Sequence, residues 1–455
     1  MYSSLILLYL LGAILVSGQQ KCYNKSTDFY ALTGTRTPYH LVGGTLERPK
    51  KKCEPLQVWA IIRHGTRYLQ DYEVPEYGID GLEKIRDEIV ENHQRGAGHL
   101  CSEDVEKIRS WRFTAHIRPH DSDDMTELGH YEMSSLGTRL KNFFPEIFDV
   151  DPDQVTPDDF QFQATNFTRT IESMKSFQRG FFGKVLEVES KVPLTNDALL
   201  IPQKQCPAWK KKNRPADVNK ERDTFTNGPE FDIIKREVAE KLGYNEPLSF
   251  EKIKPMYEMC RWEAAWFPNE TSTWCMAFTK EHLKYYEYRE DLNYYYCCGP
   301  AQRLSQKLGC LTLSDMFNHF ESKKQQVPDE PRGVFYFVHT LSNQQLMAAL
   351  GIAKYPEFDG TSYSTAANRT YRNSFNAAFG TQLMAIFYKC EEDEKSPYKV
   401  QFQQAEKVIP MDGCDDEGLC DWEYLKSKFG RAVQECSMDV CYQNLPNRTT
   451  PPIYF

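Results

Sequence analysis

The sequence has few long apolar segments. Its one long apolar run extends from Leu5 to Val16 and is followed by Ser17-Gly18, the layout of a signal peptide over residues 1–18. Twelve residues are too few to cross a bilayer, and no other stretch approaches the roughly 20 apolar residues that a transmembrane helix needs. The sequence therefore argues against a membrane-spanning protein. It predicts entry into the secretory pathway and an extracellular or endomembrane lumenal location.

An excess of positive charge is absent as well. The 55 Lys and Arg residues are outnumbered by 64 Asp and Glu residues, which leaves a formal charge of −9. This balance argues against nucleic acid as the main partner, although it does not exclude a local anion site. The lysine runs at 50–52 and 210–212 could rim such a site, but short runs are usually solvated surface, and we favour that interpretation. Peripheral association with a membrane and the oligomeric state stay open.

The 14 cysteines lack Cys-x-x-Cys spacing, which makes zinc a poor interpretation. So many thiols are expected to pair in an oxidising compartment, and their even number leaves no obligatory free one. Cys53 and Cys390 flank two strand candidates and could tie them together, whereas the adjacent Cys297 and Cys298 cannot easily pair with each other. The favoured local pairs are Cys260 with Cys275 and Cys436 with Cys441. The sequence alone does not determine this connectivity.

Sequons for N-glycosylation give weak additional support for a secreted glycoprotein. They occur at Asn24, Asn166, Asn269, Asn368 and Asn447.

The most informative segment that is present runs from Val58 to Arg67. Its apolar, β-branched start predicts a buried central strand, so Arg63, His64 and Arg67 should emerge at the carboxyl end, where open α/β sheets usually bind ligands. Two guanidiniums offer paired N–H donors to phosphoryl oxygens, and Gly65 would let the backbone come close to the anion. A histidine nitrogen there could attack phosphorus. We favour this phosphate site over the alternative that the arginines merely pair with surface carboxylates.

The segment 61–68 resembles the histidine acid phosphatase family of the histidine phosphatase superfamily, and within it the multiple inositol polyphosphate phosphatases. Three further motifs carry the resemblance. Met125-Thr126-Glu127-Leu128-Gly129 is similar to a family helix start with Thr126 as N-cap, the segment 164–173 is similar to the family's second phosphate-binding arginine segment, and the segment 333–339 matches the strand before its second histidine. The similarity covers most of residues 28–410 in order and spacing.

The resemblance implies an α/β fold. Its expected form is a three-layer sandwich with a central mixed sheet, similar to phosphoglycerate mutases, plus an inserted, mainly α-helical domain. Buried-strand candidates lie at 56–62, 158–165, 333–339 and 383–389. We expect the α/β core within 28–75, 150–205 and 330–410, the helical insert mainly within 76–149 and 206–329, and a disulfide-containing tail at 411–455.

The resemblance also implies roles for five side chains. His64 would attack in line and form a phosphohistidine, Arg63, Arg67 and Arg169 would hold the equatorial oxygens, and His339 would donate a further hydrogen bond. The substrate would be a small phosphomonoester, such as an inositol polyphosphate, bisphosphoglycerate or another organic phosphate.

This chemistry requires neither a metal nor another cofactor. His116, His120 and His130 lie near the acidic segment 121–124 and could be interpreted as a metal cluster, but we favour a solvated loop at a helix start.

One departure from the family concerns the proton donor. The family places an acid one or two residues after its second histidine, whereas those positions here hold Thr340 and Leu341. General acid catalysis is typically worth about 10²- to 10⁴-fold. An acid from the segment 121–127 could replace it. The alternative function is a pseudophosphatase that binds phosphorylated ligands without efficient turnover.

A second departure concerns the substrate. The segment 196–201 aligns with a family segment that often carries basic side chains, but here Ala198 and Ile201 are apolar. This difference puts recognition of a highly phosphorylated inositol in doubt, unless the short alignment is off by a residue or two.

Overall fold

The computed structural model describes residues 22–23, 29–113, 124–156, 158–185, 191–193, 195, 197–353, 358–391 and 393–443. The signal peptide expected at 1–18 lies outside the described residues, as do the sequons at Asn24 and Asn447 and the histidines His116 and His120. Within the described ranges, no helix is both long and apolar enough to cross a membrane.

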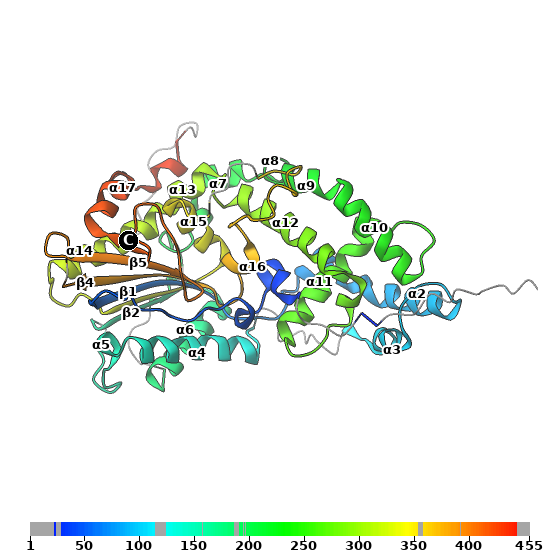
Figure 1. The fold of residues 1–455 in the computed structure, drawn as a ribbon, viewed down its shortest axis with the longest axis horizontal. Coiled ribbons are helices and arrows are strands. Elements are labelled where there is room, and N and C mark those ends of the chain that lie inside the picture. Colours follow the sequence, from blue (N-terminus) through cyan, green and yellow to red (C-terminus); the bar gives the residue numbers. More distant parts are fainter. Residues whose placement is uncertain are drawn as a thin grey trace, which may run out of the picture.

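A mixed sheet forms one end of the molecule, and a helical part forms the other (Figure 1). The strand order is β2-β3-β1-β4-β5-β6, with β7 also paired to β5. Strands β2, β3 and β1 run parallel, whereas β4 is antiparallel to β1. The strands are β1 (Cys53–Arg63), β2 (Phe160–Ala164), β3 (Gly333–Val338), β4 (Gln382–Cys390), β5 (Tyr398–Gln404), β6 (Lys407–Val408) and β7 (Leu419–Asp421). The mixed sheet and its four buried-strand candidates are therefore confirmed.

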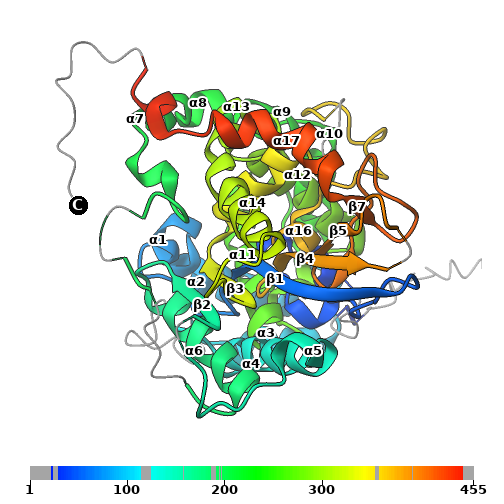
Figure 2. The same cartoon turned by 90° about the vertical axis from the view of Figure 1, so that its left-hand side faces the viewer.

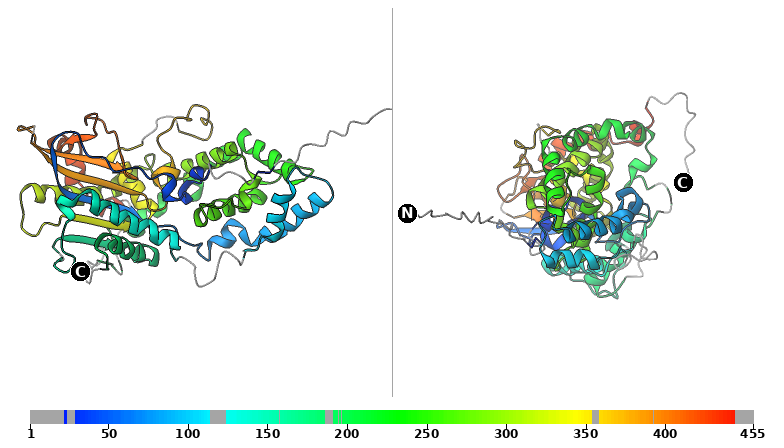
Figure 3. Two further views of the ribbon diagram at one scale, coloured as in Figure 1. Left: turned by 60° about the horizontal axis from the view of Figure 1, so that its bottom comes forward. Right: turned by 90° about the vertical axis from the view of Figure 1, so that its right-hand side faces the viewer.

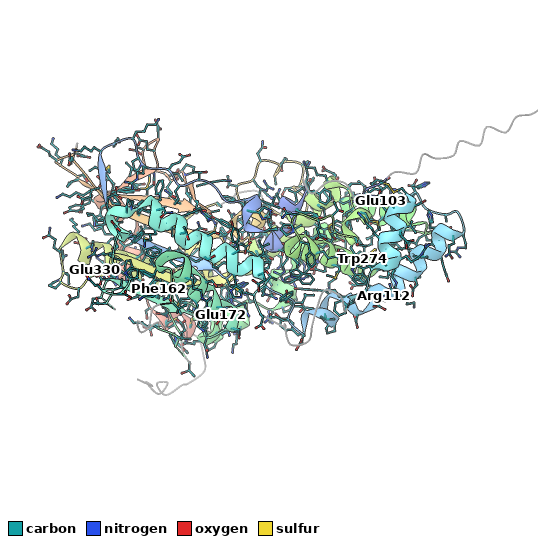
Figure 4. The ribbon with its side chains drawn as sticks, turned by 90° about the horizontal axis from the view of Figure 1, so that it is seen from below. Glu103, Arg112, Phe162, Glu172, Trp274 and Glu330 are labelled. Carbon is teal, nitrogen blue, oxygen red and sulfur yellow. A yellow bond between two sulfur atoms is a disulfide. The ribbon has the colours of Figure 1, made fainter. Side chains whose placement is uncertain are left out.

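Three helices cover one face of the sheet: α4 (Glu127–Phe143), α5 (Pro145–Phe148) and α6 (Thr168–Phe182) (Figure 2). Phe162 of β2 stacks on Phe335 of β3 in this core, with ring centroids 5.5 Å apart (Figure 4). Gly137 and Gly180 let α4 and α6 approach closely, because a Cβ on Gly180 would lie 1.8 Å from the carbonyl oxygen of Ser134. Burial of this aromatic layer fixes α6 against the strands that carry the site.

The opposite face is covered by α14 (Cys310–Lys324), α15 (Thr340–Leu350) and α17 (Trp422–Gln434). Phe387 of β4 stacks on Phe320 at 4.9 Å and contacts Trp422 at 5.7 Å between ring centroids. The three layers match the predicted sandwich.

The helical part continues from the carboxyl ends of the parallel strands (Figure 3). Its core contains Trp274, which packs edge-to-face on Trp111 at 5.1 Å (Figure 4). Its longer helices are α2 (Leu82–Gln94), α3 (Ser102–Ser110), α10 (Pro229–Leu242), α11 (Phe250–Trp266) and α12 (Lys280–Cys297). The shorter ones are α1 (Glu73–Tyr77), α7 (Pro207–Lys212), α8 (Pro215–Val218), α9 (Lys220–Thr226), α13 (Arg303–Leu308) and α16 (Asn373–Asn376).

Several elements that pack on the sheet lie in ranges that the sequence assigns to the insert or the tail. Helices α4 and α14 fall within the ranges expected for the helical insert, yet each buries an apolar face against the strands. The segment 411–443 is expected to be a tail, but β7 pairs with β5 and α17 packs on the sheet. Helical spacing predicts a helix without saying which core it covers, which explains these differences.

Six disulfides join the described cysteines. The pairs Cys53–Cys390 and Cys260–Cys275 are confirmed. The expected pair of Cys436 with Cys441 is wrong, because α17 brings Cys436 to Cys310 of α14, and Cys441 lies beside Cys206 at the start of α7. The two remaining pairs are Cys22–Cys101 and Cys414–Cys420. Cys297 and Cys298 are free thiols, so the even count does not pair every cysteine.

Candidate active site

The predicted site residues meet at the carboxyl ends of three parallel strands. Arg63 ends β1 and His64 follows it, His339 follows β3, and Arg169 lies in the first turn of α6 after β2. The backbone amide of His64 donates to the carbonyl of Val338 at 3.1 Å. The imidazole rings of His64 and His339 are 5.6 Å apart, measured between centroids. Parallel pairing therefore brings together groups that are more than 270 residues apart in sequence, at the edge where α/β sheets usually bind ligands.

His64 is buried and held in one orientation. Its Nδ1 lies 2.9 Å from the carbonyl oxygen of Gly65. A carbonyl only accepts, so Nδ1 carries the proton and the lone pair lies on Nε2. Burial, with the positive charges of Arg63 and Arg169, holds the pKa of His64 well below its usual value. The ring is therefore neutral, which is the form in which a nitrogen can act as a nucleophile.

Arg63 is locked by the backbone. Its Nη1 donates to the carbonyls of Thr35 at 2.6 Å and Ala377 at 2.5 Å. Its guanidinium also lies 4.4 Å from the centroid of the Phe379 ring. Burial, with the neighbouring charge of Arg36, lowers the pKa of Arg63 to about 9. Among the described residues, no carboxylate forms an ion pair with Arg63, although the charges of Glu290 and Glu132 act on it at longer range.

Arg67 is oriented by a carboxylate that also binds a second arginine. Its two Nη atoms donate to Glu73 at 2.8 and 2.9 Å, and Arg36 donates to the same carboxylate at 3.0 Å. Burial alone would raise the pKa of Glu73, but Arg67 and Arg36 outweigh it and lower the pKa to about 2. The Nε atoms of Arg63 and Arg67 are both buried without a hydrogen-bond partner among the described residues. Two neighbouring guanidiniums with unused N–H donors suit a phosphoryl group.

His339 and Arg169 form the other side of the site. An Arg169 Nη lies 3.3 Å from His339 Nδ1, and His339 Nε2 lies 3.0 Å from the hydroxyl of Thr165. Burial and the charge of Arg169 hold the pKa of His339 well below its usual value. The Phe167 ring packs edge-on against His339 at 4.8 Å and beneath Arg169 at 4.8 Å.

The loop between Arg63 and Arg67 is fastened to the start of α4. Glu132 accepts from the amide of Thr66 at 2.8 Å, and the hydroxyl of Thr126 accepts from the amide of Gly129, which confirms the predicted N-cap. Gly65 is also required for packing against α4. A Cβ there would lie 2.5 Å from the carbonyl oxygen of Gly129, so glycine is needed for this contact with α4, and the expected approach to an anion stays a prediction.

The positions expected to hold the proton donor contain no acid. Thr340 is buried in the first turn of α15, and Leu341 packs against an apolar cluster that includes Cys206, Trp209 and Cys298. Of the segment 121–127, residues 121–123 lie outside the described residues, and Glu127 is exposed on α4. The replacement acid proposed from this segment therefore stays a prediction.

Other predicted candidates lie elsewhere. Lys51 and Lys52 pair with Asp415 and Glu391 beside the start of β1, the strand end opposite to Arg63, and residues 210–212 are exposed. His130 Nδ1 lies 2.8 Å from the hydroxyl of Ser176. These placements favour the solvated interpretations.

Sequence reasoning missed three charged residues at the site: Arg36, Glu73 and Lys204. Lys204 Nζ lies 4.1 Å from the centroid of the Phe167 ring, on the Arg169 side. Burial and the charge of Arg169 lower the pKa of Lys204. Lys204 lies three residues after the segment 196–201, where the family often carries basic side chains. This short distance is the signal that could have revealed it.

Comparison with known families decides how this geometry is classified. The family model for the histidine phosphatase superfamily (branch 2) matches residues 56–403. The chain belongs to this family. It is therefore a phosphatase that acts on phosphomonoesters.

Named relatives align with most of this chain. Multiple inositol polyphosphate phosphatase 1 of Drosophila melanogaster is 27% identical over 93% of this chain and 91% of its own length, and that of Homo sapiens is 24% identical over 89% and 84%. Among solved structures, multiple inositol polyphosphate phosphatase from Bifidobacterium longum in complex with phosphate has a TM-score of 0.66 and 13% identity, covering 90% of this chain and 99% of that one. The likeness confirms the α/β fold with its helical addition.

The low pKa of His64 predicts an unusual pH dependence. An ordinary histidine gains a proton as the pH falls through about 6.5 and would then lose its nucleophilic lone pair. Because the pKa of His64 is lower, we expect formation of the phosphoenzyme proposed below to continue without loss as the pH falls through about 6.5. Rapid-quench measurement of phosphoenzyme against pH checks this result. A fall in its amplitude centred near pH 6.5 would contradict it.

Proposed function

We propose that this phosphatase hydrolyses small phosphomonoesters in two steps through a phosphohistidine on His64. The proposal rests mainly on His64 itself, whose proton on Nδ1 is bonded to Gly65 while Nε2 remains available. The first step would form an Nε2–phosphorus bond and break the bond to the leaving oxygen. The second would transfer the phosphoryl group to water. Splitting hydrolysis in this way replaces one difficult step with two easier ones.

Charge at the site supports a bound phosphoryl group. Within the described structure, Arg63 forms no ion pair, and the Nε atoms of Arg63 and Arg67 lack partners. A dianionic oxygen cluster would supply both. Phosphoryl transfer depends mostly on such positioning and charge stabilisation, so these groups, with Arg169, would hold the equatorial oxygens. His339 would contribute its hydrogen bond by exchanging its contact with Thr165 for the phosphate.

Lys204 supports a substrate with more than one anionic group. It lies beyond Arg169 across the Phe167 ring, where it is exposed and forms no ion pair with a described residue. A second phosphate on a compact scaffold could reach it while the first occupies the arginines. We therefore propose inositol polyphosphates as substrates, with bisphosphoglycerate and similar organic phosphates as further candidates. The apolar Ala198 and Ile201 do not weaken this proposal, because Lys204 supplies the charge that they lack.

Lys204→Ala tests this substrate class. We expect KM for inositol hexakisphosphate to rise roughly 10-fold, since one charge-assisted contact is lost, while KM for 4-nitrophenyl phosphate changes less than about twofold. Released phosphate measured against substrate concentration gives both values. The matched control is Lys210→Ala, an exposed lysine on the neighbouring helix α7. Equal KM changes for the two substrates would exclude a distal contact.

The second candidate function is a pseudophosphatase. The observation that favours it is the absence of an acid at Thr340 and Leu341. Such a protein would bind phosphate or vanadate but release phosphate inefficiently even from an activated ester. Phosphate release from 4-nitrophenyl phosphate separates the two functions, because its leaving group departs without a proton donor.

A secretory location is part of the proposal. Six disulfides suit an oxidising compartment, where such bonds persist. Mass spectrometry of protein from a secretory host, without reduction, reports both the pairing and the mature N-terminus.

A further inference from the structure

Tyr294 lies next to the phosphate site on a helix that the sequence motifs do not include. It is one turn after Glu290 on α12, so the two side chains share a helix face. Glu290 accepts from the amide of Thr35 at 2.9 Å and from its hydroxyl at 2.8 Å. The carbonyl of the same Thr35 accepts from Arg63 Nη1. This face of α12 therefore borders Thr35, whose carbonyl holds the Arg63 guanidinium.

Tyr294 and Leu341 both pack against the apolar cluster that contains Cys206, Trp209 and Cys298. Leu341 is the second residue after His339 and occupies a position where the family places its acid. Tyr294 therefore borders both Thr35, which holds Arg63, and the apolar cluster against which Leu341 packs. Its backbone is fixed, because its carbonyl accepts from the amides of Cys298 at 3.1 Å and Gly299 at 2.8 Å at the end of the helix.

The hydroxyl of Tyr294 differs from those of three tyrosines near it, although the buried hydroxyls of Tyr257 and Tyr286 also lack partners among the described residues. The hydroxyls of Tyr288, Tyr296 and Tyr371 each bond to a protein oxygen at 2.6–2.7 Å. Within the described residues, none bonds to the hydroxyl of Tyr294, and its side chain is only half-buried. A phenol in such a place normally finds a partner, so this one is available to a ligand.

The charges around this phenol favour its protonated form. Burial and the nearby Glu290 raise the pKa of Tyr294 above its usual value, against the opposing effect of Arg36. Arg63 also lies within electrostatic range of the phenol. A protonated hydroxyl within electrostatic range of the phosphate-binding arginine can give its proton to a leaving oxygen that comes within reach.

We propose that Tyr294 is the catalytic proton donor of this phosphatase, in the role that a carboxylate has elsewhere in the family. The inference rests on the proposed phosphohistidine mechanism. As the bond between phosphorus and the ester oxygen breaks, its electron pair stays on that oxygen, which takes the hydroxyl proton of Tyr294. The products of this step are the free alcohol, phosphohistidine and a tyrosinate beside Arg63 and Arg36.

The second step restores the acid. A water oxygen attacks the phosphorus, the electron pair of the nitrogen–phosphorus bond returns to His64 Nε2, and one water proton passes to the tyrosinate. Phosphate leaves and the starting state returns. An alkoxide is a stronger base than a phenolate, so the first proton transfer becomes favourable as an alkyl ester bond breaks.

The test compares leaving groups in the Tyr294→Phe variant, which keeps the ring and loses only the hydroxyl. We expect kcat on 2-glycerophosphate to fall by about 10²- to 10⁴-fold, and kcat on 4-nitrophenyl phosphate to fall less than about threefold. Vanadate inhibition should stay unchanged. The matched control is Tyr296→Phe on the same helix, whose hydroxyl bonds to the carbonyl of Phe358. This control should keep both activities.

The following results would contradict the proposal. Equal losses on both esters, with weaker vanadate inhibition, would make Tyr294 a support of the arginines and overturn the donor role. Unchanged rates on both esters would assign the donor to another residue. If the unmodified protein cleaves only aryl esters, it has no working proton donor, and the role proposed for Tyr294 is overturned. A parent that cleaves neither ester would overturn the proposed function itself. The dependence of parental rates on leaving-group basicity needs no variant, and a steep dependence would contradict the proposal.

Discussion

His64→Ala will abolish phosphate release, with a loss on the order of 10⁴- to 10⁶-fold, because no other nucleophile lies at the end of β1. The parent should also form an acid-labile, alkali-stable phosphoenzyme when mixed with labelled substrate, and the variant should not. Quenched labelling followed by peptide mapping measures both. The label should lie on the peptide that contains His64.

A matched control separates chemistry from loss of folding. His99→Ala removes an exposed imidazole in the helical part, whose side chain is 54% exposed beside Glu240. It should keep full turnover and labelling. Phosphate release by a folded His64→Ala at the parental rate would contradict the assignment of the nucleophile.

Installing a carboxylate at Leu341 will restore alkyl phosphate hydrolysis to a protein that lacks Tyr294. In the Tyr294→Phe background, Leu341→Glu should raise kcat on 2-glycerophosphate by about 10²-fold or more, since a positioned acid is worth that much. In the parental background the gain should be smaller. Aryl phosphates should gain little in either. Released phosphate on the two esters, in all four proteins, checks these expectations.

The cost of this change is in packing. Leu341 is half-buried against Cys298 and Trp209, so a glutamate there loses apolar contact and is partly desolvated. Its position in the first turn of α15 offsets part of that cost, because a negative charge is stabilised near a helix N-terminus. Leu341→Gln is the control, with similar shape and no acid. If a folded Leu341→Glu gains no more than Leu341→Gln in the Tyr294→Phe background, position 341 does not reach the leaving oxygen.

Local pattern was enough to predict the strands and the first half of the site. An apolar, β-branched run predicts the buried strand β1, and the abrupt change to Arg63 and His64 marks its end. The N-cap at Thr126 follows from a polar residue before helical spacing. Such features depend on neighbours along the chain, so one sequence contains them.

Pairings across the chain were less predictable. The disulfide of Cys436 with Cys310, the packing of α17 on the sheet and the contact of Gly65 with Gly129 all join segments whose separation carries no local signal. Short separation favoured Cys441 as the partner of Cys436, but the direction in which α17 leaves the sheet decides the pairing. Chain proximity is a weak guide when rigid helices determine where their ends point.

By itself, the sequence determined which residues can do chemistry: a histidine between arginines at a strand end, a second histidine after another strand, and no acid behind it. The tertiary structure alone decided the environment of those groups. It buried His64 and so lowered its pKa, bridged Arg67 to Arg36 through Glu73, and packed Tyr294 against the same apolar cluster as Leu341, which stands where the family has an acid. The physical reason is that residue identity is written along the chain, whereas burial, charge proximity and hydrogen-bond partners arise only when distant segments pack together.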